Sequence, residues 1–197
     1  AGGNLLPLLL MGALASFIMG IGMTMIPCYI ILALLLAPAL VEMGIEPIAA
    51  HLFILYWGMI SFITPPVAIA SIVAAGLAGT DNMKTGLYSL RLGFVAYIVP
   101  FFFIYNPVLV GVGSAAAIVY TAVMSLAGIV LISAGTEGFL FRVGRLGWTA
   151  RIALILLGLL FFFPSRLVNL WGGLALILFV AISLLRQRTA ARMQSPG

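Results

Sequence analysis

The chain has 197 residues, of which 64% are hydrophobic and 7% are charged, and its mean hydropathy is +1.31. Soluble domains carry far more charge, so the composition excludes an ordinary soluble protein and predicts an integral membrane protein. The net charge of +5 does not indicate nucleic-acid binding, because the basic residues lie at the ends of apolar segments and form no stripe.

The first segment, residues 4 to 41, has two apolar halves separated by the stretch from Gly20 to Ile26. Glycine permits backbone turns that other residues resist, and Pro27 suits the first turn of a new helix. The pattern therefore predicts helix, break, helix. Each half falls just short of the roughly 20 residues of a membrane crossing. Length alone leaves both a re-entrant hairpin and two full spans open.

The second segment, residues 47 to 79, is uncharged but is interrupted near its middle by Thr64-Pro65-Pro66. Proline lacks the N–H that a helix interior needs, and it costs about 3 kcal/mol or more there. Two separate crossings of half this length would each be too short for the bilayer. One crossing by a broken helix is therefore the prediction.

Four further spans are predicted, at 92 to 111, 115 to 134, 150 to 165 and 168 to 186. The loops at 80 to 91 and 135 to 149 and the C-terminal tail then share one side of the membrane. That side holds eight of the nine basic residues, namely Lys84, Arg91, Arg142, Arg145, Arg151, Arg186, Arg188 and Arg192. The positive-inside rule makes it the cytoplasmic side, whereas Glu42, Glu46 and Arg166 face outward.

The two breaks are the candidate functional features of the sequence. Irregular backbone at membrane depth is tolerated only where protein buries it or a water-filled cavity solvates it. In secondary transporters such breaks expose carbonyls that coordinate sodium and half-helix N-termini that favour anionic substrates. The hydroxyls of Thr24, Ser61 and Thr64 suit that use. The alternative interpretation is a pair of packing kinks, because membrane helices are rich in Gly and Pro.

Other polar residues predict structural roles. His51, the single histidine, is expected to be a structural hydrogen-bonder rather than a proton relay. Cys28 has no partner for a disulfide and predicts a small core residue. Asp81 is expected to cap a helix. The sequence has no paired Asp, no His/Glu cluster and no Ser with a plausible His partner, so no enzyme is predicted.

Three stretches, "APALVEMGIEPIAAHLF", "ITPPVAIAS" and "FFFIYNPVLV", carry a resemblance to a known family. Residues 4 to 112 resemble the second half of the large membrane subunit of tripartite ATP-independent periplasmic (TRAP) transporters. The third stretch, followed by extra hydrophobic spans, looks most like the fused permeases that work with TAXI-type binding proteins.

The resemblance implies an elevator-type, sodium-driven importer of organic acids (dicarboxylates, keto acids or glutamate) in the bacterial inner membrane. It implies an all-α polytopic fold in which residues 1–112 are the second of two inverted repeats. This repeat comprises a re-entrant hairpin at 4–41, a broken helix at 47–79 and a span at 92–111. Residues 113–197 would be C-terminal spans and a basic cytoplasmic tail.

The same resemblance implies a site and partners. Sodium is the coupling ion, with no other cofactor, and carbonyls near Ile63 and Thr64 would face it. The candidate residues are Gly20, Gly22, Thr24, Ser61, Ile63, Thr64, Pro65 and Pro66. Expected partners are a periplasmic TAXI-type binding protein, a small membrane subunit region, an upstream permease half with the first repeat, the organic acid anion and membrane lipid. The chain is thus expected to be the C-terminal portion of a longer permease.

Two alternatives stay open at this point. A single-component sodium/dicarboxylate symporter of related architecture would need no binding protein. A structural membrane subunit would need no site at all, although an anchor gains nothing from interrupting its helices.

Overall fold

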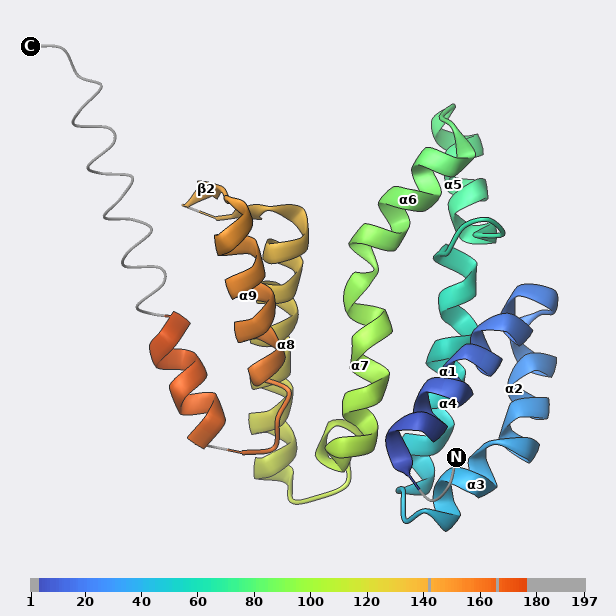
Figure 1. The fold of residues 1–197 in the computed structure, drawn as a ribbon, viewed down its shortest axis with the longest axis horizontal. Coiled ribbons are helices and arrows are strands. Elements are labelled where there is room, and N and C mark those ends of the chain that lie inside the picture. Colours follow the sequence, from blue (N-terminus) through green and yellow to red (C-terminus); the bar gives the residue numbers. More distant parts are fainter. Residues whose placement is uncertain (1–3, 142, 166, 177–197) are drawn as a thin grey trace, which may run out of the picture. The chain divides into compact units, whose positions relative to one another are not determined.

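The computed structural model describes residues 4–141, 143–165 and 167–176, and it comprises two compact units, Ala1–Ile118 and Val119–Gly197. Helices dominate both units (Figure 1), which confirms the predicted all-α polytopic class. The division of function at residues 112 and 113 stays a prediction. The predictions for Arg142, Arg166, Arg186, Arg188, Arg192 and the span beyond residue 176 lie outside the described residues.

The described elements follow the chain order of the predicted segments. Those up to residue 110 are α1 (Leu5–Gly22), α2 (Met25–Leu35), α3 (Ala37–Glu42), α4 (Pro47–Ile60), the 3-10 helix η1 (Ser61–Ile63), α5 (Ile69–Ala78), α6 (Asn82–Leu92), α7 (Phe94–Tyr105) and the 3-10 helix η2 (Pro107–Val110). Those after it are α8 (Ala115–Glu137), β1 (Phe139–Leu140), β2 (Gly144–Arg145), α9 (Trp148–Leu160) and a helix at Leu167–Leu176.

The first segment is a helical hairpin with a narrower break than predicted. Only Met23 and Thr24 separate α1 from α2, because α1 continues through both glycines that were expected to interrupt it. The second arm is itself interrupted at Leu36, and α3 begins at Ala37 with Pro38 in its first turn. Proline fits this place because the first turn of a helix needs no N–H donor. Whether the hairpin is re-entrant stays a prediction.

Helices α5 and α6 form an adjacent pair, joined by a short turn (Figure 1). Gly79 ends α5 in the left-handed conformation (φ +64°), which glycine adopts without strain. Asp81 caps α6 by accepting the backbone N–H of Lys84 at 2.8 Å, as predicted. The loop predicted at 80 to 91 is wrong, because residues from Asn82 onward are helical. A polar composition is typical of a loop, but a cap and one covered face suffice for a helix.

The core of the first unit surrounds α4. This helix packs against α1, α2, α3 and α7, and its Phe53 is fully buried. Phe53 meets Phe101 edge-on with ring centroids 5.5 Å apart, and Tyr56 meets Phe103 in the same way at 5.3 Å. The aromatic run at 101 to 103 therefore joins α7 to α4.

Two polar residues of this core have the predicted structural roles. Cys28 is 2% exposed and lies among apolar neighbours. His51 is hydrogen-bonded through Nδ1 to the Tyr29 hydroxyl at 3.0 Å, which ties α4 to α2. Both residues thus contribute to the packing of the hairpin on α4.

The second unit is built on a close crossing of α8 and α9. A Cβ added to Gly128 would lie 2.7 Å from the Gly158 carbonyl, and one added to Gly158 would lie 2.8 Å from the Gly128 carbonyl. Small residues allow such backbone approach between membrane helices. Arg151 of α9 then donates to the carbonyls of Gly135 and Thr136 at 2.9 and 2.6 Å, near the end of α8. A basic side chain at this end also complements the helix dipole.

Three described helical stretches are long and apolar enough to cross a membrane, namely α1, the continuous α6–α7 stretch Asn82–Tyr105, and α8. Large apolar side chains are exposed along them, for example Leu14, Ile18 and Val123. Exposed side chains of this kind are stable in lipid but not in water. The protein is therefore an integral membrane protein.

Candidate functional site

The site is built around the interruption between α4 and α5. Pro65 and Pro66 have no N–H, so the carbonyls of Ser61 and Phe62 lose the donors four residues ahead of them. The Ser61 carbonyl is rescued by a 3-10 hydrogen bond from the Thr64 N–H at 3.3 Å. The Phe62 carbonyl has no such replacement, because residue 65 is also a proline and has no N–H. The proline pair thus interrupts the helix and leaves the Phe62 carbonyl without a helical donor.

The backbone re-enters a helix through a strained residue. Ala68 has φ +33° and ψ +49°, a left-handed conformation that costs a residue with a side chain roughly 1–2 kcal/mol. Its N–H still donates to the Thr64 carbonyl at 3.0 Å. That carbonyl, predicted to face an ion, therefore already has a protein partner. Strain of this kind persists where surrounding packing holds the chain.

Two hydroxyl groups are hydrogen-bonded to backbone carbonyls next to the break. The Ser61 hydroxyl donates to the Gly58 carbonyl at 2.7 Å, and the Thr64 hydroxyl donates to the Ile60 carbonyl at 2.7 Å. Thr64 Oγ1 is also hydrogen-bonded to the Tyr97 hydroxyl of α7. Because a carbonyl can only accept, Thr64 is the donor to Ile60, and Tyr97 must donate to Thr64. One lone pair of Thr64 Oγ1 remains.

The hairpin contributes one predicted residue to this place. Gly20 is buried where α1 crosses α4, and a Cβ there would collide with the Gly58 carbonyl and lie 2.7 Å from Ser61 Oγ. Gly22 and Thr24 are exposed at the end of the hairpin, and nothing lies within 4 Å of a Cβ at Gly22. The fold thus brings Gly20 to Ser61, whereas Gly22 and Thr24 lie on the surface beyond that contact.

Two further polar groups lie close to this crossing. Ser16 is 0% exposed, one helical turn before Gly20, and its Oγ has no hydrogen-bond partner among the described residues. The Nε1 atom of Trp57 is likewise buried without a partner in the described chain. Buried polar atoms normally have partners, so these two mark a place where a polar ligand or water would be stabilised.

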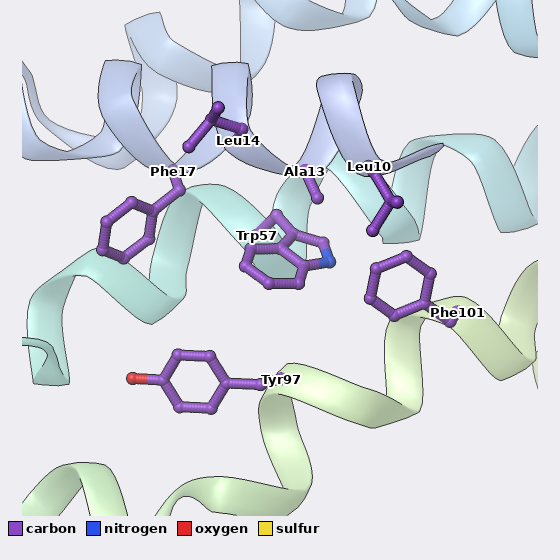
Figure 2. Close-up of a pocket in the computed structure, with 7 residues that line it drawn as sticks. All are labelled: Leu10, Ala13, Leu14, Phe17, Trp57, Tyr97 and Phe101. Atoms are coloured by element: carbon purple, nitrogen blue, oxygen red, sulfur yellow. The ribbon is translucent and has the colours of Figure 1, made fainter. Parts of the chain in front are cut away.

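A mainly apolar cavity of about 340 Å³ opens beside the break (Figure 2). Figure 2 shows Trp57 and Tyr97 across it from the side chains of α1, and the lining residues are Leu10, Ala13, Leu14, Phe17, Trp57, Tyr97 and Phe101. The Trp57 ring meets those of Tyr97 and Phe101 edge-on, at 6.1 and 5.7 Å. Tyr97 therefore faces the cavity and also holds Thr64.

Sequence reasoning found the break but missed some residues around it. Ser16 had a weak signal, since it lies four residues before Gly20 and so on the same helical face. Tyr97 had no sequence signal, because it lies 33 residues from Thr64 along the chain and contacts it only in the fold. No cluster of three or more His, Cys, Asp or Glu that could hold a metal occurs in the described ranges. The site offers hydroxyl and carbonyl oxygens rather than charged ligands.

Residues 1–118 match the family described as the tripartite ATP-independent periplasmic transporter, DctM component. The chain belongs to this family. The DctM match ends where the first compact unit ends, so that unit, with the hairpin and the broken helix, is the family's own part. Comparison with curated proteins and with solved structures gave no significant match. DctM is a transporter family and not an enzyme family, and the resemblance to the large membrane subunit of TRAP transporters is confirmed. The likeness to the fused permeases that work with TAXI-type binding proteins stays a prediction.

Proposed function

We propose that this DctM chain provides half of the translocation site of a sodium-driven, binding-protein-dependent importer of organic acids. The observation that carries the proposal is the open helix at Ser61–Pro66, packed against Gly20 of the hairpin. Sodium is a hard cation that is satisfied by neutral oxygens, and broken helices supply such oxygens in secondary transporters.

The oxygens available at the break support sodium better than a proton. The Phe62 carbonyl has no helical donor, because residue 66 is a proline and has no N–H. Thr64 Oγ1 keeps one lone pair after its two hydrogen bonds. Neither Asp nor Glu occurs between residues 47 and 79. A proton-coupled mechanism needs a titratable carrier, and the histidine of this segment, His51, is hydrogen-bonded to Tyr29.

The start of α5 supports an anionic substrate. Helix α5 begins at Ile69, directly after the break, and its first N–H groups carry the positive end of the helix dipole. Half-helices that point this end at a carboxylate are a recurrent arrangement in transporters with inverted repeats. We therefore assign organic acids of the dicarboxylate, keto acid or glutamate class, moved by an elevator motion of this repeat and its counterpart.

The partners follow from the tripartite family. A periplasmic binding protein of the TAXI type would deliver the substrate, a small membrane subunit region would complete the permease, and a first repeat would supply the other half of the site. The bacterial inner membrane is the corresponding location, with the basic loops and the C-terminus in the cytoplasm.

Sodium-dependent uptake tests the proposal in the complete permease, reconstituted in proteoliposomes with its binding protein. Thr64→Val keeps β-branching and removes the hydroxyl, so we expect the half-saturating sodium concentration to rise about tenfold, as the loss of about 1.4 kcal/mol implies. Thr64→Ser keeps the oxygen and should shift the sodium curve by less than about threefold.

Tyr97→Phe is the matched control, because it removes the hydrogen bond to Thr64 and leaves the Thr64 oxygen in place. We expect its sodium curve to stay near that of the parent. An unchanged curve for Thr64→Val, or an equal shift for Tyr97→Phe, would show that Thr64 only supports packing. Full uptake without the binding protein would instead indicate a single-component symporter.

A further inference from the structure

The stretch from α6 to α7 packs along both halves of the broken helix. Helix α6 contacts α5 and η1, and α7 contacts α4, so one helical stretch lies beside the whole interruption (Figure 1). The other side of α6 is open, since Leu87 and Tyr88 are 58% and 65% exposed. The inner side of this stretch is therefore the part that shapes the break.

Two glycines of the stretch contact the break where a side chain would not fit. A Cβ added to Gly86 would lie 2.8 Å from Cγ of Pro65 and 3.7 Å from Cβ of Ala68. One added to Gly93 would lie 2.5 Å from Cδ1 of Ile63. Glycine is less favourable than alanine inside a helix, so Gly86 weakens α6 in exchange for this close approach.

The two contacts lie on either side of the oxygens proposed to face the ion. Ile63 directly follows the Phe62 carbonyl, and Pro65 directly follows Thr64. The Pro65 ring is rigid, whereas the end of the Ile63 side chain can rotate away. Ordinary van der Waals contact begins near 3.4 Å, so a methyl group at position 86 would force the ring and α6 apart by more than about half an ångström. A binding site keeps its geometry only within about that tolerance.

The contact with Gly86 also supports the strained residue of the break. Ala68 has φ +33°, is 3% exposed and lies against Gly86. Its N–H donates to the Thr64 carbonyl at 3.0 Å, which closes the bend from Thr64 to Ala68. Strain of this kind persists only where the surrounding structure holds it. Gly86 thus contacts the bend at Pro65 and at Ala68.

We propose that Gly86 is a positioning residue for the ion site: by leaving room for the Pro65 ring, it holds the Phe62 carbonyl and the Thr64 hydroxyl in place. Gly93 has the same role toward Ile63, with a smaller effect. Both glycines act through the residues that they contact and not through the ion itself. This inference rests on the proposed sodium coupling and assigns part of the affinity for the ion to a helix outside the break.

Sodium-dependent uptake by the complete permease, reconstituted with its binding protein, measures this role. G86A should raise the half-saturating sodium concentration about tenfold, the usual loss when a residue that supports metal ligands is changed. G93A should raise it less, because the Ile63 side chain can rotate. G93A/I63V should recover part of that shift, since valine lacks the Cδ1 atom that alanine at position 93 would meet.

G76A is the matched control, because Gly76 is an exposed residue of α5 and a Cβ there meets nothing within 4 Å. Its sodium curve should match that of the parent. A purely structural role would lower the melting temperature or the maximal uptake rate of G86A without moving the half-saturating sodium concentration.

That result, in a parent whose uptake depends on sodium, would overturn the positioning role alone. If G86A does not fold, an unchanged sodium curve for G93A overturns it in the same way. Uptake by the parent that is independent of sodium would instead overturn the proposed function, and this role with it.

Discussion

At the scale of single residues, the contact between α1 and α4 depends on the absence of side chains. Gly20 faces the Gly58 carbonyl and Ser61 Oγ so closely that a Cβ at Gly20 has no room. Gly58 in turn lies against Cys28, whose sulfur would be 3.4 Å from an added Cβ. The two glycines thereby set the distance between the hairpin and the broken helix.

Gly20→Ala should therefore destabilise the permease by about 1–3 kcal/mol, the usual cost of overpacking a tight contact. Gly22→Ala is the control, because a Cβ at Gly22 meets nothing within 4 Å and alanine favours a helix. Thermal unfolding of the purified permease, followed by intrinsic fluorescence, measures both variants. Equal melting temperatures for the two would contradict the close contact at Gly20.

The proline break and its hydroxyls could be predicted from local chemistry, because the missing N–H of Pro65 and Pro66 acts on residues within one turn. The sequence predicts Gly20 at the break of the hairpin, whereas the structure places it inside α1 as a packing residue. Tyr97 could not be predicted as a neighbour of the site, because its position depends on how α7 packs against α4, which no local pattern encodes. Trp57 lies four residues before Ser61 on α4 and so had the same weak signal as Ser16.

At the scale of elements, α6 shows how a short capped helix escapes prediction from hydropathy. Its charged residues interrupt the apolar pattern and so suggested a loop, whereas the Asp81 cap and the packing of Gly86 against Pro65 fix a helix. The long apolar helices α1 and α8 were predicted close to their observed bounds, because their length and hydropathy dominate other signals. Helix α7 ends earlier than its predicted span, where η2 begins at Pro107.

Loss of the Asp81 cap should loosen α6. Asp81→Ala removes the acceptor for the Lys84 N–H and should cost about 0.5–2 kcal/mol. Asp81→Asn keeps a capping oxygen and should be mild. Hydrogen–deuterium exchange of the peptide that covers α6 measures the effect, with Asn82→Ala at the next exposed position as control. Unchanged exchange in Asp81→Ala would mean that packing alone holds this helix.

At the scale of the whole molecule, the charges predict how the chain lies in the membrane. The acidic turn between α3 and α4 carries Glu42 and Glu46, and the start of α6 carries Lys84. One broken crossing by α4 and α5 places these two regions on opposite sides, with Lys84 in the cytoplasm. Two crossings would place them on the same side.

Cysteine labelling distinguishes these topologies in a Cys28→Ala background. Glu42→Cys and Lys84→Cys introduce reactive thiols at exposed positions, whereas Gly44 is unsuitable because its φ of +86° strains any side chain. A membrane-impermeant reagent added to intact cells should label position 42 and leave position 84 unmodified until the membrane is opened. Labelling of both from outside would refute the single crossing.

The contact between Gly86 and Pro65 has a consequence for how this protein can evolve. One side of α6 has no space for even a methyl group against the proline, while the other side is open to its surroundings. Mutations on the open side can accumulate one at a time as the host membrane changes. A side chain at position 86 instead requires that position 65 has first become smaller, so changes at these two positions are possible only in one order.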